Sequence, residues 1–112
     1  MQKDNLVYIK HIRDSIYKIE DFTSGLSKGD FLSEENQVVQ SGVVRELEVI
    51  GEATSKISNE YKQSRQVIPW RDMIDTRNKV IHDYLSVDYN LIWDILQKDL
   101  PNLKAQIEAL LK

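Results

Sequence analysis

Cysteine is absent from the 112 residues of this chain, which excludes disulfides, thiolate metal sites and thiol nucleophiles. No apolar run approaches the roughly 18 residues that a membrane-spanning helix requires. The first residues also lack the basic-then-apolar pattern of a secretory signal. The carboxylates have no histidine-rich company, so that neither a metal ion nor another cofactor is expected. We therefore expect a soluble cytoplasmic protein without membrane contact.

An excess of positive charge is missing as well, since the chain has a net charge of −3. This argues mildly against nucleic-acid binding, because neutralisation of phosphates drives most of such affinity. The charge is nevertheless polarised. Residues 30–60 are strongly acidic, whereas basic side chains prevail in residues 62–82. The basic segment can serve an RNA ligand, or acidic and basic helices can pair within the fold, which suits most of these charges better.

Apolar residues recur at steps of three and four nearly throughout the chain, which is the helical period. No strand pattern and no internal repeat interrupts this period. The sequence therefore predicts one all-α domain over residues 1–112, an antiparallel bundle of four to five helices. The expected helices cover about 4–23, roughly 34–57, 70 to about 84, and two segments after 88 and 101.

Single residues mark the expected ends and crossings of these helices. Asp4 or Asn5 is the expected cap of the first helix, and residues 30–33 are expected to form a short turn. Gly42 and Gly51 each weaken the second helix by about 1 kcal/mol relative to alanine. Such a cost is typical of positions where another helix passes close.

The chemistry is concentrated in one octapeptide, Arg77-Asn78-Lys79-Val80-Ile81-His82-Asp83-Tyr84. An arginine binds a phosphate bidentately and keeps its proton. A histidine is the side chain best suited to move protons near neutral pH. Together these groups are what a metal-free site for cleaving phosphodiesters needs.

A helical wheel places Arg77 in the middle of the apolar arc of its helix. With about 100° per residue, Arg77 lies near the centre of that arc, and His82 lies roughly 140° away. An unpaired cation there would cost several kcal/mol, so Arg77 should meet a carboxylate, a phosphate or a second chain. Asn78 and His82 are neighbours at i and i+4. A two-fold axis beside this helix would bring two arginines and two histidines around one cleft.

Plainer interpretations of the same residues remain open. His82 can be a favourable cation at the C-terminal end of its helix, and Tyr84 can be an ordinary boundary aromatic. Arg77 can form a structural ion pair with Glu48 or Glu52, which recur four residues apart on the second helix. That pair is compatible with function, because it would also orient the arginine.

At these residues the chain resembles a known family. Arg77-Asn78-x-x-x-His82-x-Tyr84 is similar to the Arg-x4-His-x-Tyr motif of HepT-like proteins, a branch of the HEPN superfamily of small helical domains. Residues 45–53 resemble the second-helix signature of that branch. Residues 68–71 resemble the lead-in to its motif helix, and residues 99–101 its late Leu-Pro break. The resemblance covers nearly the whole chain in order and spacing.

The resemblance implies the toxin of a two-gene, type VII-like toxin–antitoxin module, acting as a metal-independent endoribonuclease. The toxin would be a homodimer whose facing motif helices share a cleft. Carried over by position, Arg77 would hold the scissile phosphate, and His82 would be the general acid–base catalyst for attack by the ribose 2′-hydroxyl. Asn78 would position the phosphate or His82.

The same resemblance implies a partner, an antitoxin that is a minimal nucleotidyltransferase. It would inactivate the toxin by transferring AMP to the motif tyrosine, here Tyr84. The attached anionic nucleotides would occupy the phosphate site at Arg77 and so prevent RNA from binding. An alternative is a non-catalytic helical interaction module that binds this nucleotidyltransferase or is modified by it. A third interpretation is a structural dimer in which Arg77 forms an interfacial ion pair.

Overall fold

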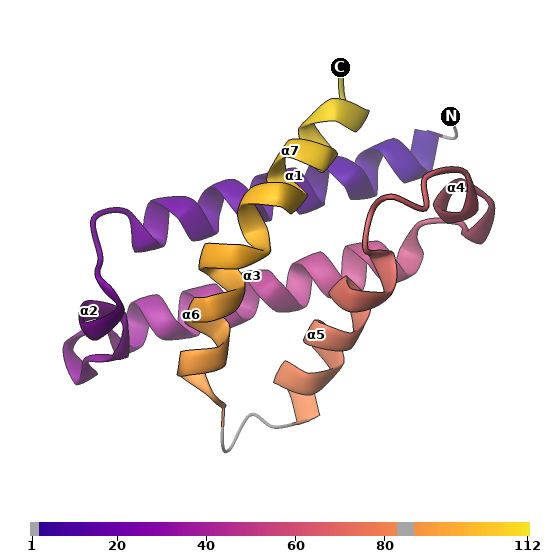
Figure 1. The fold of residues 1–112 in the computed structure, drawn as a ribbon. Helices are drawn as coiled ribbons and strands as arrows, with labels where there is room; N and C mark the ends of the chain where they lie inside the picture. The colour runs from indigo at the N-terminus through magenta and orange to yellow at the C-terminus, as the bar shows by residue number, and fades with distance from the viewer. Residues whose placement is uncertain (1–2, 83–86) are drawn as a thin grey trace.

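A computed structural model describes residues 3–82 and 87–112, with the backbone alone for Lys3 and for residues 79–82. Most of these residues are helical and none of them forms a strand, which confirms the all-α prediction. Five longer helices match the upper expected number, and two short α-helices and one short 3-10 helix accompany them among the described residues (Figure 1). The elements are α1 (Lys3–Thr23), α2 (Lys28–Leu32), the 3-10 helix η1 (Glu34–Asn36), α3 (Gln37–Lys56), α4 (Asn59–Ser64), α5 (Trp70–His82), α6 (Tyr89–Lys98) and α7 (Leu100–Leu110).

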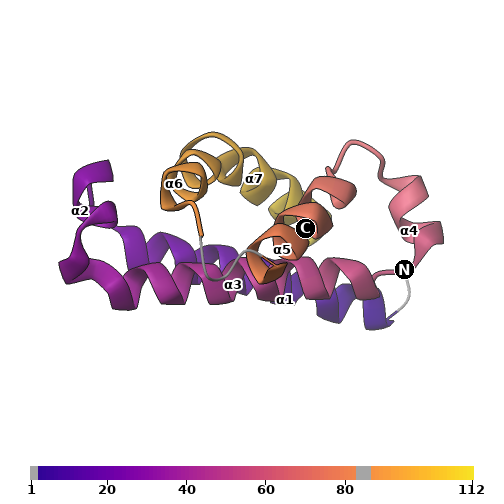
Figure 2. The same ribbon diagram turned by 90° about the horizontal axis from the view of Figure 1, so that it is seen from below.

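The helices form two layers. The long helices α1 and α3 run antiparallel in one layer, and α5, α6 and α7 lie across one side of this pair (Figure 2). The molecule measures 43 × 28 × 20 Å, and its shortest dimension is about the thickness of two helices of 10–12 Å each. Within the described ranges, no helix is both long and apolar enough to span a bilayer.

The predicted apolar stripes meet between the layers. Ile9, Ile12 and Ile19 of α1 are completely buried, as is Ile107 of α7. The stripe of α3 faces them, because its apolar residues also recur at the helical period. Phe22 follows Ile19 at the same three-residue step near the end of α1, yet it remains 40% exposed. The stripe of α3 buries Val43, Leu47, Ile50 and Ala53, and Ile57 directly after the helix continues it.

Residues 30–32 of the predicted turn at 30–33 belong to the short helix α2, and Ser33 directly follows it. Ser27 and Asp30 form a capping box, in which each side chain accepts a hydrogen bond from the other residue's backbone N–H. Periodicity cannot reveal such a helix, since five residues are too few to repeat a pattern. Ser33 then caps η1 by accepting from the N–H of Glu35 at 3.2 Å.

The predicted cap at Asp4 or Asn5 is wrong, because both residues lie inside α1. The buried side chain of Asn5 instead reaches Ser58, 53 residues further along the chain. Its Nδ2 donates to Ser58 Oγ at 3.1 Å, and its Oδ1 accepts from the Ser58 N–H at 3.0 Å. Ser58 Oγ also accepts from the N–H of Tyr61. Asn5 thus fixes the start of α4 against α1.

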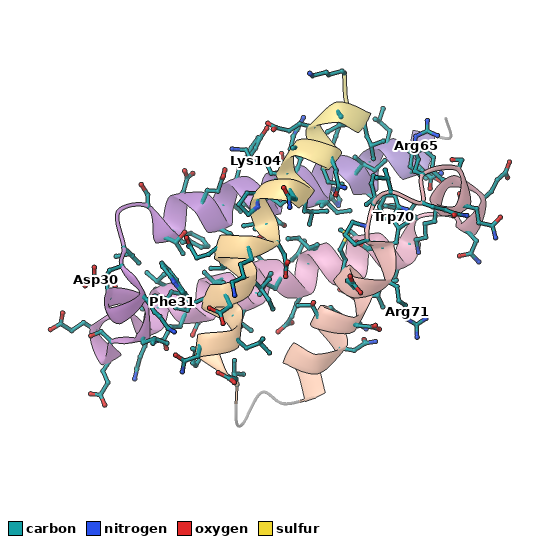
Figure 3. The ribbon with its side chains drawn as sticks, in the orientation of Figure 1. Asp30, Phe31, Arg65, Trp70, Arg71 and Lys104 are labelled. Carbon is teal, nitrogen blue, oxygen red and sulfur yellow. The ribbon has the colours of Figure 1, made fainter. Side chains whose placement is uncertain are left out.

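The start of α5 is anchored by Trp70. Its indole Nε1 donates to the backbone oxygen of Arg65 at 3.1 Å, and its buried ring packs edge-on against Tyr61. Figure 3 labels Trp70 and Arg65 at this end of the molecule. The tryptophan therefore sets where the motif helix leaves the loop after α4.

The first and last long helices are linked by polar contacts along their exposed edge. Tyr17 Oη donates to a carboxylate oxygen of Glu108 at 2.6 Å, which raises the pKa of Tyr17 above its ordinary value. Lys104 Nζ donates to Glu20 at 3.0 Å, and this bond raises the pKa of Lys104. These contacts close the bundle by joining α7 to α1.

Candidate functional site

The centre of the candidate site is the point where α5 crosses α3, and Gly51 makes this crossing possible. A Cβ atom on Gly51 would lie 1.9 Å from the Cβ of Arg77 and 2.5 Å from its Cγ. It would also come within 3.2 Å of the backbone oxygen of Met73. The stem of Arg77 therefore occupies the space that any other residue at position 51 would fill. The predicted close approach of another helix to α3 is confirmed here.

The guanidinium of Arg77 is held by two neighbours beyond this crossing. Its Nη1 donates to the Oδ1 of Asn78 at 2.8 Å. Its Nη2 lies 3.5 Å from the Oε1 of Glu52, which is next to Gly51 on α3. The wheel argument required a partner for this cation, and Glu52 is that partner among the described residues. Glu48, the other expected carboxylate, forms no ion pair with any of them.

The side chain of Arg77 is only partly buried. The side chain keeps 29% of its surface, whereas the Nε atom is buried and meets no acceptor in the described part of the chain. A guanidinium has five N–H donors, and Asn78 and Glu52 engage only two of its nitrogens. An anion approaching from solvent can therefore still bind to this arginine.

The acidic segment (residues 30–60) and the basic segment (residues 62–82) form few ion pairs with each other among the described residues. Among the ion pairs between described residues, only Arg77–Glu52 joins the basic segment to the acidic one. Arg71 pairs with Asp75 on its own helix at 3.2 Å and extends into solvent, 87% exposed (Figure 3). Partial burial lowers the pKa of Lys62 on α4. Most basic side chains of residues 62–78 thus remain free of the acidic helix.

The remaining predicted site residues lie at the edge of the described region. His82 is the last residue of α5, and its side chain lies outside the described residues. Tyr84 lies outside them altogether. The structure thus brings Arg77, Asn78 and Glu52 together, whereas the distance from Arg77 to His82 stays a matter of prediction. The residues it describes contain no group of histidines and carboxylates suited to a metal ion.

Comparison of the chain with known proteins identifies its family. A family model described as "Ribonuclease HepT-like" matches residues 12–110. The chain is 38% identical over its whole length to the whole of a protein named "Probable ribonuclease HepT" from Thermococcus cleftensis. It is 32% identical to a protein named "Putative RNase" from Methanocaldococcus jannaschii, with 96% of both chains covered.

A third relative combines two activities in its name. It is a "Gamma-glutamylcyclotransferase and putative RNase" of Methanocaldococcus jannaschii, 36% identical over 96% of this chain and 47% of its own length. No solved structure matches the chain. The family model and the full-length relative agree with each other, and the chain belongs to the ribonuclease HepT-like family.

Proposed function

We propose that this protein is a metal-independent endoribonuclease, the toxin of a two-gene toxin–antitoxin module that acts in the cytoplasm. The observation that carries the proposal is the guanidinium of Arg77, fixed by the crossing at Gly51 and by its contacts to Asn78 and Glu52. It is preorganised, charged at every physiological pH and partly open to solvent, which suits a group that must hold a phosphate. The names of the relatives support RNA as the substrate.

In this mechanism Arg77 neutralises the charge that develops on the scissile phosphate. His82, five residues further along the motif helix, removes the proton of the ribose 2′-hydroxyl and returns a proton to the leaving 5′-oxygen. The 2′-oxygen attacks the phosphorus and the bond to the 5′-oxygen breaks. The products are a cyclic 2′,3′-phosphate and a 5′-hydroxyl, and no metal ion takes part.

The test is cleavage of RNA in the presence of EDTA, with analysis of the product ends. Arg77→Ala and His82→Ala should each lose activity by at least about 100-fold, the contribution typical of acid–base catalysis. His11→Ala is the matched control for His82→Ala, because His11 is exposed on α1, outside the site. Unchanged cleavage by His82→Ala, or cleavage abolished by EDTA, contradicts the mechanism.

A homodimer with a shared cleft is part of the proposal. On an ideal helix, positions 77 and 82 are roughly 140° apart, and a second protomer can supply the missing partner. Mixed dimers of Arg77→Ala and His82→Ala protomers distinguish the arrangements. If one site takes its arginine and histidine from different protomers, each mixed dimer retains one intact site and activity returns. Sites built within one protomer leave the mixture inactive.

Regulation by a nucleotidyltransferase antitoxin completes the proposal, with Tyr84 as the acceptor of AMP. Intact-mass analysis after co-expression with that enzyme should show additions in multiples of AMP. Tyr84→Phe should abolish the additions, whereas Tyr17→Phe, which removes an exposed tyrosine of α1, should not. Additions that persist in Tyr84→Phe contradict this assignment.

A further inference from the structure

A groove of about 790 Å³ lies on the flank of α5 that faces the α6–α7 arm. Its floor is formed by buried core residues of α3, α5 and α7, among them Leu47, Met73 and Leu103. The half-buried Leu91 and Ile95 line the wall that α6 contributes. The groove is open to solvent on one side, and it therefore presents apolar surface of the core to any partner of suitable shape.

The rim of this groove is acidic. Asp72 and Asp75 lie on α5, and Asp88 and Asp99 lie at the two ends of α6. All four are exposed, and no lysine or arginine lines the groove within the described residues. Asp75 is paired with Arg71 at 3.2 Å, whereas Asp72, Asp88 and Asp99 form no ion pair with any described residue. These three carboxylates repel the phosphates of a nucleic acid, and the described residues contain no cluster of the kind that holds a metal ion. The charge of the rim is complementary to a cationic protein segment.

The length of the rim points to the shape of this segment. Asp88 and Asp99 are separated by the whole of α6, roughly 16 Å at 1.5 Å per residue, which is the length of about three helical turns. An amphipathic helix placed in an apolar groove contributes anchors at positions i, i+3, i+4 and i+7 over the same length. Lysines and arginines beside these anchors would meet the aspartates.

We propose that this groove docks one amphipathic, positively charged helix of a protein partner. The rim residue Asp72 lies on another flank of α5 than the candidate site, because positions 72 and 77 are about 140° apart around the helix and positions 72 and 78 about 120°. A helix bound in the groove therefore leaves the side of Arg77 and Asn78 uncovered. The proposal does not depend on the ribonuclease activity.

The test selects ligands from a displayed library of random helical peptides of about 14 residues, or four turns. Selected peptides should share apolar residues at i, i+3, i+4 and i+7 and carry several lysines or arginines. The affinity of a synthetic representative for the double variant Asp72→Asn/Asp99→Asn should fall at least about tenfold. The affinity should also fall when the salt concentration rises.

The matched control is Asp21→Asn/Asp94→Asn, which removes two exposed aspartates that do not line the groove, one of them on α6. Its affinity for the peptide should equal that of the unmodified protein. All four substitutions are at the surface and should change stability by less than about 0.5 kcal/mol. Selection of neutral or acidic peptides, equal binding by both double variants, or no enrichment at all overturns the proposal. Occupation of the groove by a second copy of this chain also overturns it. In that case sedimentation would show a weaker self-association for Asp72→Asn/Asp99→Asn than for Asp21→Asn/Asp94→Asn.

Discussion

Replacing Gly51 with alanine should destabilise the protein although alanine is the better helix former. The substitution stabilises α3 by about 1 kcal/mol through helix propensity. The new Cβ, however, would lie 1.9 Å from the Cβ of Arg77, whereas non-bonded carbon atoms prefer about 3.5–4.0 Å. Both atoms are fixed to their backbones, so no side-chain rotation relieves the clash. Helix α5 would have to retreat from α3 by roughly 2 Å.

Overpacking that shifts a backbone costs about 3 kcal/mol at the upper end of its usual range. After the gain of about 1 kcal/mol in helix propensity, the expected result is a net loss of roughly 2 kcal/mol in the free energy of unfolding. For a chain of this size the melting temperature should fall by roughly 8 °C. The guanidinium of Arg77 moves with α5, so RNA cleavage should decrease more than the folded fraction does. Urea unfolding and cleavage assays on the same preparation measure both effects.

Gly42→Ala is the matched control on the same helix. The three heavy atoms nearest to its new Cβ all belong to the ring of Phe22, the closest at 3.0 Å, and Phe22 is 40% exposed, so that its ring can turn aside. The gain in helix propensity should therefore prevail, leaving stability unchanged or raising it by up to about 1 kcal/mol. The reasoning is refuted if Gly51→Ala proves as stable as Gly42→Ala.

Three further substitutions test contacts outside this crossing. Asn5→Ala should lower the free energy of unfolding by about 1–3 kcal/mol, since it leaves the Ser58 N–H without its buried partner. A loss below about 0.5 kcal/mol in urea unfolding, which is roughly the scatter of surface substitutions, would contradict this role of Asn5. The bond to Glu108 raises the pKa of Tyr17, so the folded state favours the protonated phenol; this stabilisation is present below the ordinary pKa near 10 and disappears as the pH rises through the raised value. Stability measured against pH should thus decline more steeply above pH 10 in the unmodified protein than in Tyr17→Phe, and identical curves would refute the assignment. Glu52→Gln should change stability by less than about 1 kcal/mol, because the carboxylate is 55% exposed and its ion pair is screened by solvent; a loss of several kcal/mol by calorimetry would show that the pair is structural.

The longer helices could be predicted from the sequence because their apolar residues repeat over several turns. The four isoleucines Ile9, Ile12, Ile16 and Ile19 are almost completely buried, as their spacing requires. The short helix α2 could not be predicted in the same way, since its only buried residue is Phe31. Its existence depends on a capping box and on the contact of Phe31 with Trp93 of α6, 62 residues away.

The carboxylate that pairs with Arg77 could not be predicted from the sequence. Glu48 and Glu52 are four residues apart, so both lie on one face of α3 and the sequence cannot distinguish them. The choice depends on where α5 crosses α3. That crossing is fixed at Gly51, which places Glu52 and not Glu48 beside the guanidinium. Likewise, Asn5 has the residue type of a helix cap, and only the tertiary packing of α4 assigns it to Ser58.

The link between α1 and α7 has a consequence for the protein as it leaves the ribosome. The partners Tyr17 and Glu108 are 91 residues apart, so this contact can form only when nearly all of the chain has been synthesised. Helices α1 and α3 can pair much earlier, because domains fold as their segments emerge. Until α7 arrives, this early hairpin exposes the apolar side that α7 later covers with Leu103 and Ile107. A chain that stops before Leu100 therefore leaves this apolar side of α1 uncovered and is prone to aggregate, so the finished fold depends on its last helix.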